Sequence, residues 1–326
     1  MFMKRKFLAI LLLLFVCFNT SVLKTVYANE QLYLGGMPAG FSIETRGAYV
    51  VGLSDVVTEN GIKSPSKIAN IQIGDIILCV DDMEVNNSID LANCINNENT
   101  RILKIKRKDQ INLVTIKPEK DINGYYKIGV LIRENINGIG TITYIKGNKF
   151  ASLGHPILDE TGNLVEIRSG NLFKVNITGC VKGERGKAGE LRGVFLKTKS
   201  IGNFTKNTNC GVFGEIDFNE MCVNNLTKIE AGHAMVGDAC IYSTVYGETP
   251  RKYSISIVKV DDDICSKNFV IKITDKELLD LTNGIVQGMS GSPIIQNNKL
   301  VGAVTHVFTN DPTRGFGVSI ENMLNK

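Results

Sequence analysis

The segment Gly284–Phe308 carries the clearest chemical signature in the chain. A serine, Ser290, stands between glycines in the run Gly288–Pro293, and two apolar runs joined by a polar turn follow it. A serine hydroxyl is a weak nucleophile, so it needs a nearby general base, a group that orients this base, and donors for the oxyanion. We therefore weigh Ser290 as a nucleophile, with the Gly288 and Ser290 amides as oxyanion hole, against a purely structural turn.

The turn is similar to the nucleophile turn of chymotrypsin-like peptidases, in which Gly-x-Ser-Gly-Gly-Pro precedes a hairpin. Here Ser292 replaces the second glycine after the serine. In such folds the next strand lines the substrate cleft, and the resemblance implies substrate-binding roles for Thr305, His306 and Val307. The β-rich surroundings and this strand favour the nucleophile over the structural turn.

A base for Ser290 must be found among three histidines. His306 lies on the strand after the nucleophile hairpin, where it lines the cleft and does not serve as base. His155 lies in "ASLGHPILD" and His233 in "EAGHAMVGD". Composition and spacing leave both of them open, because a lone histidine is often only a satisfied core or surface residue.

The orienting acid is equally open from the residues alone. Asp275 lies fifteen residues before Ser290, but Thr274 and Glu277 around it also fit a helix capping box, with Thr274 as the cap. The other candidates for this role are Asp159, Asp238 and Asp311.

The elements that must position these residues fall into two halves. Residues 37–118 contain short β-type runs and one expected helix, Ser88–Ile95, with Ser88 as N-cap. After a polar joint, apolar runs recur about every ten residues, separated by Gly, Asn or Asp, which predicts a sandwich or barrel. Further helices are expected near Lys276–Leu281 and in the C-terminal "SIENMLNK".

The first half resembles a PDZ domain in its segment Ser64–Val85, where a short helix leads through a turn into a strand that begins Gly74-Asp75. Asn70 stands where the family has Gly, and Asn tolerates the left-handed backbone of such a turn. PDZ domains add an extended peptide to a sheet edge. We expect the peptide terminus to be received at Gly40, Phe41, Ser42 and Ile43, against the alternative that these residues form only a strand-leading turn.

Charge and cysteine content exclude several classes of protein. The formal net charge of +4 comes from the four basic residues among residues 1–28, and the remaining 33 basic and 33 acidic residues cancel. A neutral body gives no electrostatic reason to bind nucleic acid. The eight cysteines include Cys17 near the N-terminus and show no CxxC spacing, which argues against a metal site or a disulfide framework.

The N-terminus predicts export. The basic residues Lys4–Lys6 precede an apolar run, Phe7–Phe18, of the length of a signal-peptide core and too short to span a bilayer alone. Cleavage after Ala28 and an uncleaved anchor both remain open. In either case the rest of the chain lies outside the cytoplasm, close to the membrane if the anchor is kept.

Several longer segments resemble the stage IV sporulation protein B peptidases, the SpoIVB family of PDZ-bearing serine peptidases of endospore-forming bacteria. They are "FASLGHPILD", "FGEI", "VIKITDKELL" and the stretch from Gly284 to Leu324. The resemblance runs from about Gly40 to Leu324 and is densest from Ile273 onwards. It implies that Ser290 is the nucleophile, His155 the base and Asp275 the orienting acid, with no metal or cofactor.

The resemblance implies a mainly β chain, in which a PDZ domain (α+β) precedes a chymotrypsin-like double β-barrel. The expected parts are a signal or anchor (1–28), a short linker (29–36), the PDZ domain (37–120) and the peptidase (121–326). The family is secreted into the space between forespore membranes. It cleaves itself and then a membrane-bound regulator of sigma-K processing, while its PDZ takes a peptide C-terminus or internal peptide.

Two departures from the family limit this expectation. The linker in which self-cleavage usually falls is nearly absent, and Glu44 stands where the family tends to have Gly. The alternative is a non-catalytic PDZ scaffold or checkpoint protein with an inert peptidase half.

Overall fold

The structure is a computed structural model that describes residues 31–326 except 109, 160–161, 197–198, 218, 222–224 and 262–266. The expected signal or anchor, residues 1–28, therefore lies outside the described residues. Within them, no helix is both long and apolar enough to cross a membrane.

Six strands close a first β-barrel. Each pairs with the next in the order β2, β11, β12, β16, β15, β13, and β13 pairs again with β2. Buried side chains such as Ile43, Phe150 and Phe204 fill its interior. The strands are β2 (Pro38–Leu53), β11 (Val130–Lys146), β12 (Lys149–Ser152), β13 (Ile167–Val181), β15 (Gly202–Thr208) and β16 (Gly211–Ile216).

A second closed barrel follows in the chain, with the order β18, β19, β20, β23, β22, β21 and back to β18. Along β19, Tyr253, Ile255 and Ile257 alternate inward, the period of two that a strand with one buried face requires. The strands are β18 (Gly237–Ser243), β19 (Arg251–Val260), β20 (Phe269–Ile273), β21 (Pro293–Gln296), β22 (Lys299–Phe308) and β23 (Asp311–Ser319).

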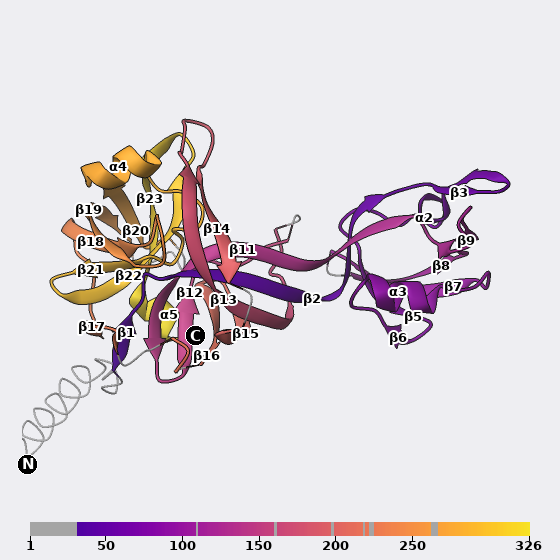
Figure 1. Ribbon diagram of the computed structural model, residues 1–326, viewed down its shortest axis with the longest axis horizontal. Coiled ribbons are helices and arrows are strands. Elements are labelled where there is room, and N and C mark those ends of the chain that lie inside the picture. The colour runs from indigo at the N-terminus through magenta and orange to yellow at the C-terminus, as the bar shows by residue number, and fades with distance from the viewer. Residues whose placement is uncertain are drawn as a thin grey trace, which may run out of the picture. The chain divides into compact units, whose positions relative to one another are not determined.

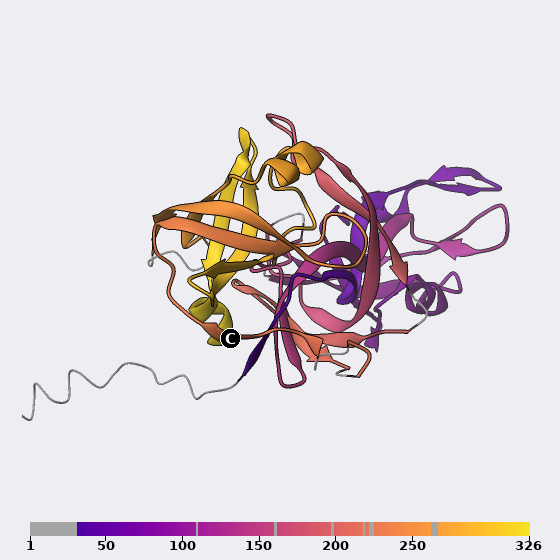
Figure 2. The same ribbon diagram turned by 60° about the vertical axis from the view of Figure 1, so that its left-hand side comes forward.

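Short elements complete the two barrels (Figures 1 and 2). They are β1 (Leu32–Leu34), β14 (Glu190–Leu196), β17 (Lys228–Ala231), α4 (Lys276–Thr282) and α5 (Ile320–Leu324). The predictions of a mainly β chain and a double-barrel architecture are confirmed. Both predicted helices of this half are present, but the N-cap of α4 is Asp275, not Thr274, because its side chain accepts the Leu278 N–H.

A small domain is inserted between β2 and β11, which leave and re-enter the first barrel. Its elements are β3 (Val56–Thr58), β4 (Gly61–Lys63), α2 (Pro65–Ile68), β5 (Ile76–Val80), β6 (Met83–Glu84), α3 (Ser88–Cys94), β7 (Arg101–Arg107), β8 (Gln110–Ile116), β9 (Glu119–Lys120) and β10 (Tyr126–Lys127). Ala48, Ile77 and Leu103 belong to its separate core. The N-cap of α3 is Asn87, which accepts the Asp90 N–H, and not Ser88.

The expected boundary between linker and PDZ domain at residue 37 is therefore wrong. Residues 39–44 of β2 pair with β11 on one side and β13 on the other, so they belong to the first barrel. Only the far end of β2 reaches the small domain, where Ala48 and Tyr49 pair with β5. The small domain interrupts the barrel sequence and does not simply precede it (Figure 1).

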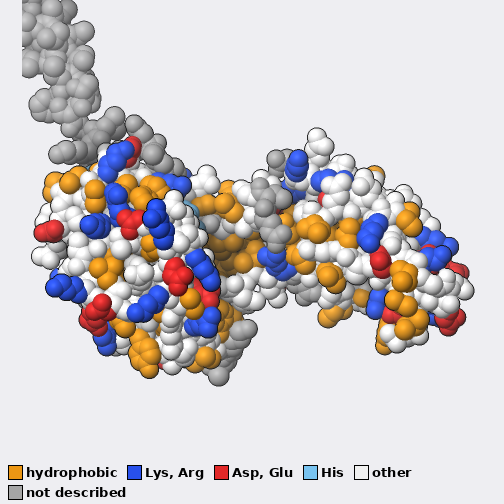
Figure 3. Space-filling model, turned by 90° about the horizontal axis from the view of Figure 1, so that it is seen from above, with side chains coloured by type: hydrophobic (Ala, Val, Ile, Leu, Met, Phe, Trp, Pro, Cys, Tyr) orange, Lys and Arg blue, Asp and Glu red, His pale blue; other side chains and the backbone are white. Residues whose placement is uncertain are grey.

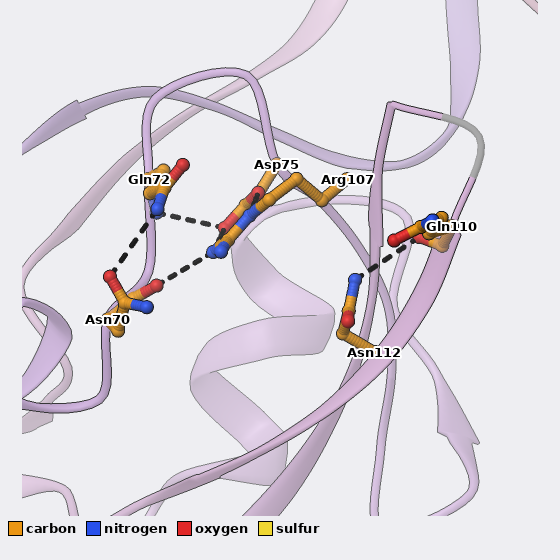
Figure 4. A network of polar contacts seen from close by, with 6 residues as sticks. All are labelled: Asn70, Gln72, Asp75, Arg107, Gln110 and Asn112. Carbon is orange, nitrogen blue, oxygen red and sulfur yellow. Dashed lines mark hydrogen bonds and ion pairs between the residues drawn. The ribbon is translucent and has the colours of Figure 1, made fainter.

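A polar network fixes the turn before β5 (Figure 4). The buried Asp75 carboxylate accepts from Arg107 Nε at 2.7 Å, from Arg107 Nη2 at 2.8 Å and from the Gln72 N–H at 2.9 Å. Arg107 also donates to the Asn70 carbonyl, and Asn70 adopts the left-handed backbone that its place in the turn predicts, with φ 57°. The aspartate thus ties the turn to strand β7.

On the face shown in Figure 3, basic and acidic side chains lie interspersed among apolar and neutral ones. This distribution agrees with the zero net charge calculated after residues 1–28 are removed.

We expect Asp75→Ala to lower the free energy of unfolding by about 2–4 kcal/mol, because it leaves Arg107 without its buried partner. Urea unfolding followed by circular dichroism measures the change. Asp55→Ala is the control: its ion pair with Lys67 is exposed at both ends, so a much smaller loss is expected. Equal losses in both variants would contradict the structural role of Asp75.

Candidate active site

Ser290 lies in the turn between α4 and β21, at the edge of the second barrel. Gly291 follows it with φ +93°, and a Cβ there would come within 2.1 Å of the Thr141 carbonyl oxygen, so only glycine fits. Thr141, on β11 of the first barrel, donates its N–H to the Ser290 carbonyl and its hydroxyl to the Gly288 carbonyl, each at 2.9 Å. The nucleophile turn is therefore held by the opposite barrel.

The backbone donors of this turn point to an anion site. The carbonyls of Gly288 and Ser290 are bound by Thr141, whereas neither N–H has an acceptor among the described residues. Gly288 has φ +97°, a conformation that L side chains rarely adopt. Two unpaired N–H groups, one on the serine and one two residues before it, match the oxyanion hole expected at these positions.

The Ser290 hydroxyl donates to the Thr305 carbonyl at 2.7 Å. Thr305 lies on β22, so the serine side chain rests against the strand that was predicted to line the cleft. In this position the Ser290 hydroxyl donates its hydrogen bond to a backbone carbonyl and not to a histidine. A rotation of the Ser290 side chain is therefore needed before it reacts.

A tight turn places His155 beside β22. Leu153 has φ +66°, and the Gly154 N–H donates back to the Ser152 carbonyl at 2.8 Å, which closes a three-residue turn after β12. A bulky residue with this backbone is strained. A Cβ on Gly154 would lie 2.9 Å from a side-chain carbon of Thr305, so the turn packs directly on the serine's partner.

The histidine ring is set up as a neutral base. Its Nδ1 lies 2.8 Å from the Pro156 carbonyl oxygen, which only accepts, so Nδ1 carries the hydrogen and Nε2 keeps its lone pair. Burial lowers the His155 pKa below its ordinary value, more than this hydrogen bond raises it. At neutral pH the ring is therefore uncharged and able to accept a proton.

His306 packs against His155, with ring centroids 4.7 Å apart. Burial, then the neighbouring His155 and Lys267, lower its pKa to about 4, so it is neutral as well. The pairing of β21 with β22 ends at Ala303, so beyond it β22 pairs only with β23. His306 and Val307 thus follow Thr305, whose carbonyl binds Ser290, on a stretch of β22 with which no second strand of the described residues pairs.

The structure distinguishes between the two candidate bases. His155 contacts His306, the neighbour in sequence of the Thr305 carbonyl that binds Ser290. His233 instead pairs with Glu321 at 2.6 Å, with its side chain 83% exposed. Both histidines lie near β22, but His233 follows β17, which pairs with Lys299 and Leu300 at the start of that strand. Only His155 lies at the other end, beside Thr305 and His306, where the serine binds.

Asp275 is engaged elsewhere. One carboxylate oxygen accepts the Leu278 N–H as the cap of α4, and the other accepts the Ser254 N–H on the outer side of β19. No hydrogen bond or ion pair joins it to His155 among the described residues. Asp159 and Asp311 likewise bind local backbone N–H groups, those of Asn163 and Thr313. The orienting role of Asp275 stays a prediction, without a contact that supports it.

Two residues that the sequence analysis missed support the His155 turn. Thr141 accepts, on its carbonyl, the Ser152 hydroxyl at 2.6 Å. Asn207 binds Ile157, two residues after His155, through both its N–H and its carbonyl, and also the Val165 carbonyl. Neither lies in a motif, and only the three-dimensional pairing of β11, β12 and β15 reveals them.

The prediction that Gly40, Phe41, Ser42 and Ile43 form a peptide-binding loop is wrong. These residues form the middle of β2 and pair on both sides, so their backbone N–H groups are not available to a carboxylate. A large cavity of the small domain lies instead between α3 and the start of β11. Leu91 and Ile95 line one wall and Val130 and Ile132 the other. An apolar-glycine pair just before a strand, Ile128-Gly129, was the available signal.

A family model described as SpoIVB peptidase S55 matches residues 124–324. The Rv3671c protease from M. tuberculosis in its active form is similar in structure, at 13% identity over 58% of this chain and 72% of that chain, with a TM-score of 0.34. A serine-to-alanine mutant of the same protease in its inactive form has 13% identity over 58% and 79%, with a TM-score of 0.31. No curated protein was found to match the chain.

The acid limb of the pH profile tests the state of His155. The ring must be neutral to accept a proton, and its pKa is lowered from 6.5 by burial, so kcat/KM is expected to fall with acidification around a midpoint below pH 6.5. His233→Gln is the control, because this exposed histidine lies outside the site and its loss should not move the limb. A midpoint above pH 6.5 would contradict the buried neutral base.

Asp275 is tested by a pair of substitutions. Asn caps a helix as well as Asp does, so we expect Asp275→Ala to lose about 1 kcal/mol of stability and Asp275→Asn much less. Thermal unfolding measures both. The same variants decide the catalytic role, since an orienting acid replaced by Asn would lower kcat by about 10⁴-fold with stability kept, and a pure cap would not.

Proposed function

The chain belongs to the SpoIVB peptidase S55 family and is a serine endopeptidase, and from this premise we propose that Ser290 and His155 carry its reaction. The supporting observation is that each residue stands on a different barrel and both contact the same strand. Ser290 donates to Thr305, and the His155 ring packs on His306. These two adjacent residues of β22 bring the nucleophile and the base to one place.

In the proposed reaction, Ser290 turns from the Thr305 carbonyl towards Nε2 of His155 and attacks the scissile carbonyl. His155 takes the hydroxyl proton and later gives it to the leaving amine. The Gly288 and Ser290 N–H groups hold the oxyanion. Substrate backbone pairs with the open edge of β22 at Thr305–Val307.

In this conformation the Pro156 carbonyl fixes the His155 tautomer, which is one of the tasks of an orienting acid. A carbonyl does not carry the full negative charge that stabilises an imidazolium. For Asp275 to supply that charge, as the family resemblance implies, its carboxylate must leave Leu278 and Ser254.

We further propose that the small domain is a PDZ-type module and binds peptide in the cavity between α3 and β11. Strand β11 pairs with β2 on one side at Val130–Ile132, which leaves its other edge towards the cavity. An extended peptide can add to such an edge, with apolar side chains received by Leu91 and Ile95 of α3.

The biological proposal follows from the family. The protein is exported into the space between the forespore membranes, cleaves itself, and then cleaves a membrane-bound regulator in the sigma-K checkpoint of endospore formation. The alternative is a PDZ scaffold with an inert peptidase half. The two unpaired N–H groups and the neutral His155 beside β22 favour the enzyme.

A fluorophosphonate probe separates these two functions. We expect it to label the wild-type chain at one residue, Ser290, with no labelling in Ser290→Ala, and incubation of the wild type alone to give self-cleavage products that the variant lacks. Labelled peptides and cleavage products are identified by mass spectrometry.

Ser292→Ala is the matched control for that experiment. Ser292 is buried and donates to the Ser243 hydroxyl, so its loss should leave labelling in place. Absence of labelling in the wild type, with the fold intact by circular dichroism, would contradict the enzymatic proposal and support the alternative of a PDZ scaffold with an inert peptidase half.

A further inference from the structure

An aromatic and cationic surface continues from the His155–His306 pair along β22 and β23. We define it by Phe308, Phe316, Arg314 and Lys267. Phe308 and Phe316 face each other across the two strands, with ring centroids 4.6 Å apart. The Arg314 guanidinium lies over the Phe308 ring at 5.7 Å, and the Lys267 ammonium lies over the Phe316 ring at 5.0 Å. The side chains of Phe308, Arg314 and Phe316 are partly exposed.

The surface is continuous with the active site. His306 and Phe308 are two positions apart on β22, about 7 Å along the strand. Lys267, which lies over the Phe316 ring, is also close enough to His306 for its charge to lower the His306 pKa. His306 already contacts His155. A substrate chain that pairs with the open edge of β22 therefore passes His155 and then the Phe308–Phe316 pair.

The two cations have no acidic partner in the described part of the chain. Neither Arg314 nor Lys267 takes part in an ion pair there, although eleven other Lys or Arg side chains do. Arg314 Nε is in addition buried and has no hydrogen-bond partner among the residues that the structure describes. The nearest acid on the hairpin, Asp311, is committed to the N–H and hydroxyl of Thr313.

An unpaired guanidinium on an aromatic face is a receptor for a carboxylate. The planar fork of Arg binds carboxylate oxygens in pairs, and the rings exclude water from one side of that contact. Lys267 adds a second positive charge, and the neutral His306 adds an aromatic wall without charge. An acidic side chain flanked by an apolar one fits this combination, whereas a lysine or arginine there meets two like charges.

We propose that this surface is a specificity subsite, which selects substrates with an acidic residue a few positions to the amino side of the scissile bond. The proposal rests on the proposed function, because it takes the open edge of β22 as the substrate path. The chemical class of the preferred substrate is thus an extended, acidic-apolar peptide segment.

The first test measures cleavage by the full-length protein. Internally quenched peptides carry Glu, Gln or Lys at the second, third or fourth residue before the cleaved bond. We expect kcat/KM for Glu to exceed that for Lys by about tenfold or more at one of these positions. Arg314→Gln should flatten the preference and Arg314→Glu should reverse it in favour of Lys.

Arg168→Glu is the matched control, because Arg168 is an exposed cation on β13 of the first barrel, where it pairs with Glu44, and belongs to neither β22 nor β23. It should leave the Glu preference unchanged. Fluorophosphonate labelling of each variant verifies that the fold around Ser290 is intact. Equal cleavage of Glu and Lys peptides by the wild type, or an unchanged preference in Arg314→Glu, overturns the proposal.

A binding measurement separates this inference from the proposed function. The same peptides, labelled with fluorescein, are titrated with the Ser290→Ala chain and followed by anisotropy. Tighter binding of Glu than Lys peptides that Arg314→Glu reverses supports the subsite even if the wild type cleaves nothing, in which case the proposed function fails alone. Equal binding of Glu and Lys peptides counts against the subsite even if all peptides are cleaved.

Discussion

Thr141 of the first barrel holds together the two turns on which the site depends. Its N–H and hydroxyl bind the carbonyls of Ser290 and Gly288, and its own carbonyl accepts the Ser152 hydroxyl beside the His155 turn. The carbonyls of Gly288 and Ser290 are bound in this way, and the N–H groups of the same two residues have no acceptor among the described residues. The close approach leaves no room for a Cβ at Gly291, which explains the glycine after the serine better than flexibility does.

The active-site groups are held in a resting arrangement. The Ser290 hydroxyl donates a hydrogen bond to a backbone carbonyl. The His155 ring is neutral and buried, and its Nδ1 is bound to the Pro156 carbonyl. No buried charge has to be stabilised in this state, which suits a site whose rings lie against each other. In the proposed reaction, charge develops only when substrate brings a carbonyl to the Gly288 and Ser290 N–H groups, so stabilisation is directed at the reacting state more than at the resting one.

The sequence predicted features that depend on neighbouring residues, and it did not predict features that depend on pairing between strands distant in sequence. The glycines around Ser290, the left-handed Asn70 and the recurring apolar runs are local features, and each predicted its structure. The residues Gly40–Ile43 read as a glycine-containing loop, but their environment is set by β11 and β13, which lie far away in sequence. For the same reason Thr141 and Asn207 carried no signal, and Asp275 offered two roles that spacing alone does not separate.

The small domain is inserted between β2 and β11, and β11 connects its cavity to the active site. The number of residues along β11 therefore decides which way the side chains at its two ends point. This strand runs from Val130, at the cavity of the small domain, to Thr141 at the nucleophile turn, and its pairing with β2 shifts register between Leu131 and Ile132 and between Arg133 and Asn135. From Asn135 to Thr141 the pairing with β2 is regular and side chains alternate, so a one-residue insertion or deletion there would turn either Thr141 or the residues before it to the wrong side, whereas a two-residue change would not. Related chains that differ in the length of this connection are therefore expected to differ by even numbers of residues, or to place a β-bulge where they do not.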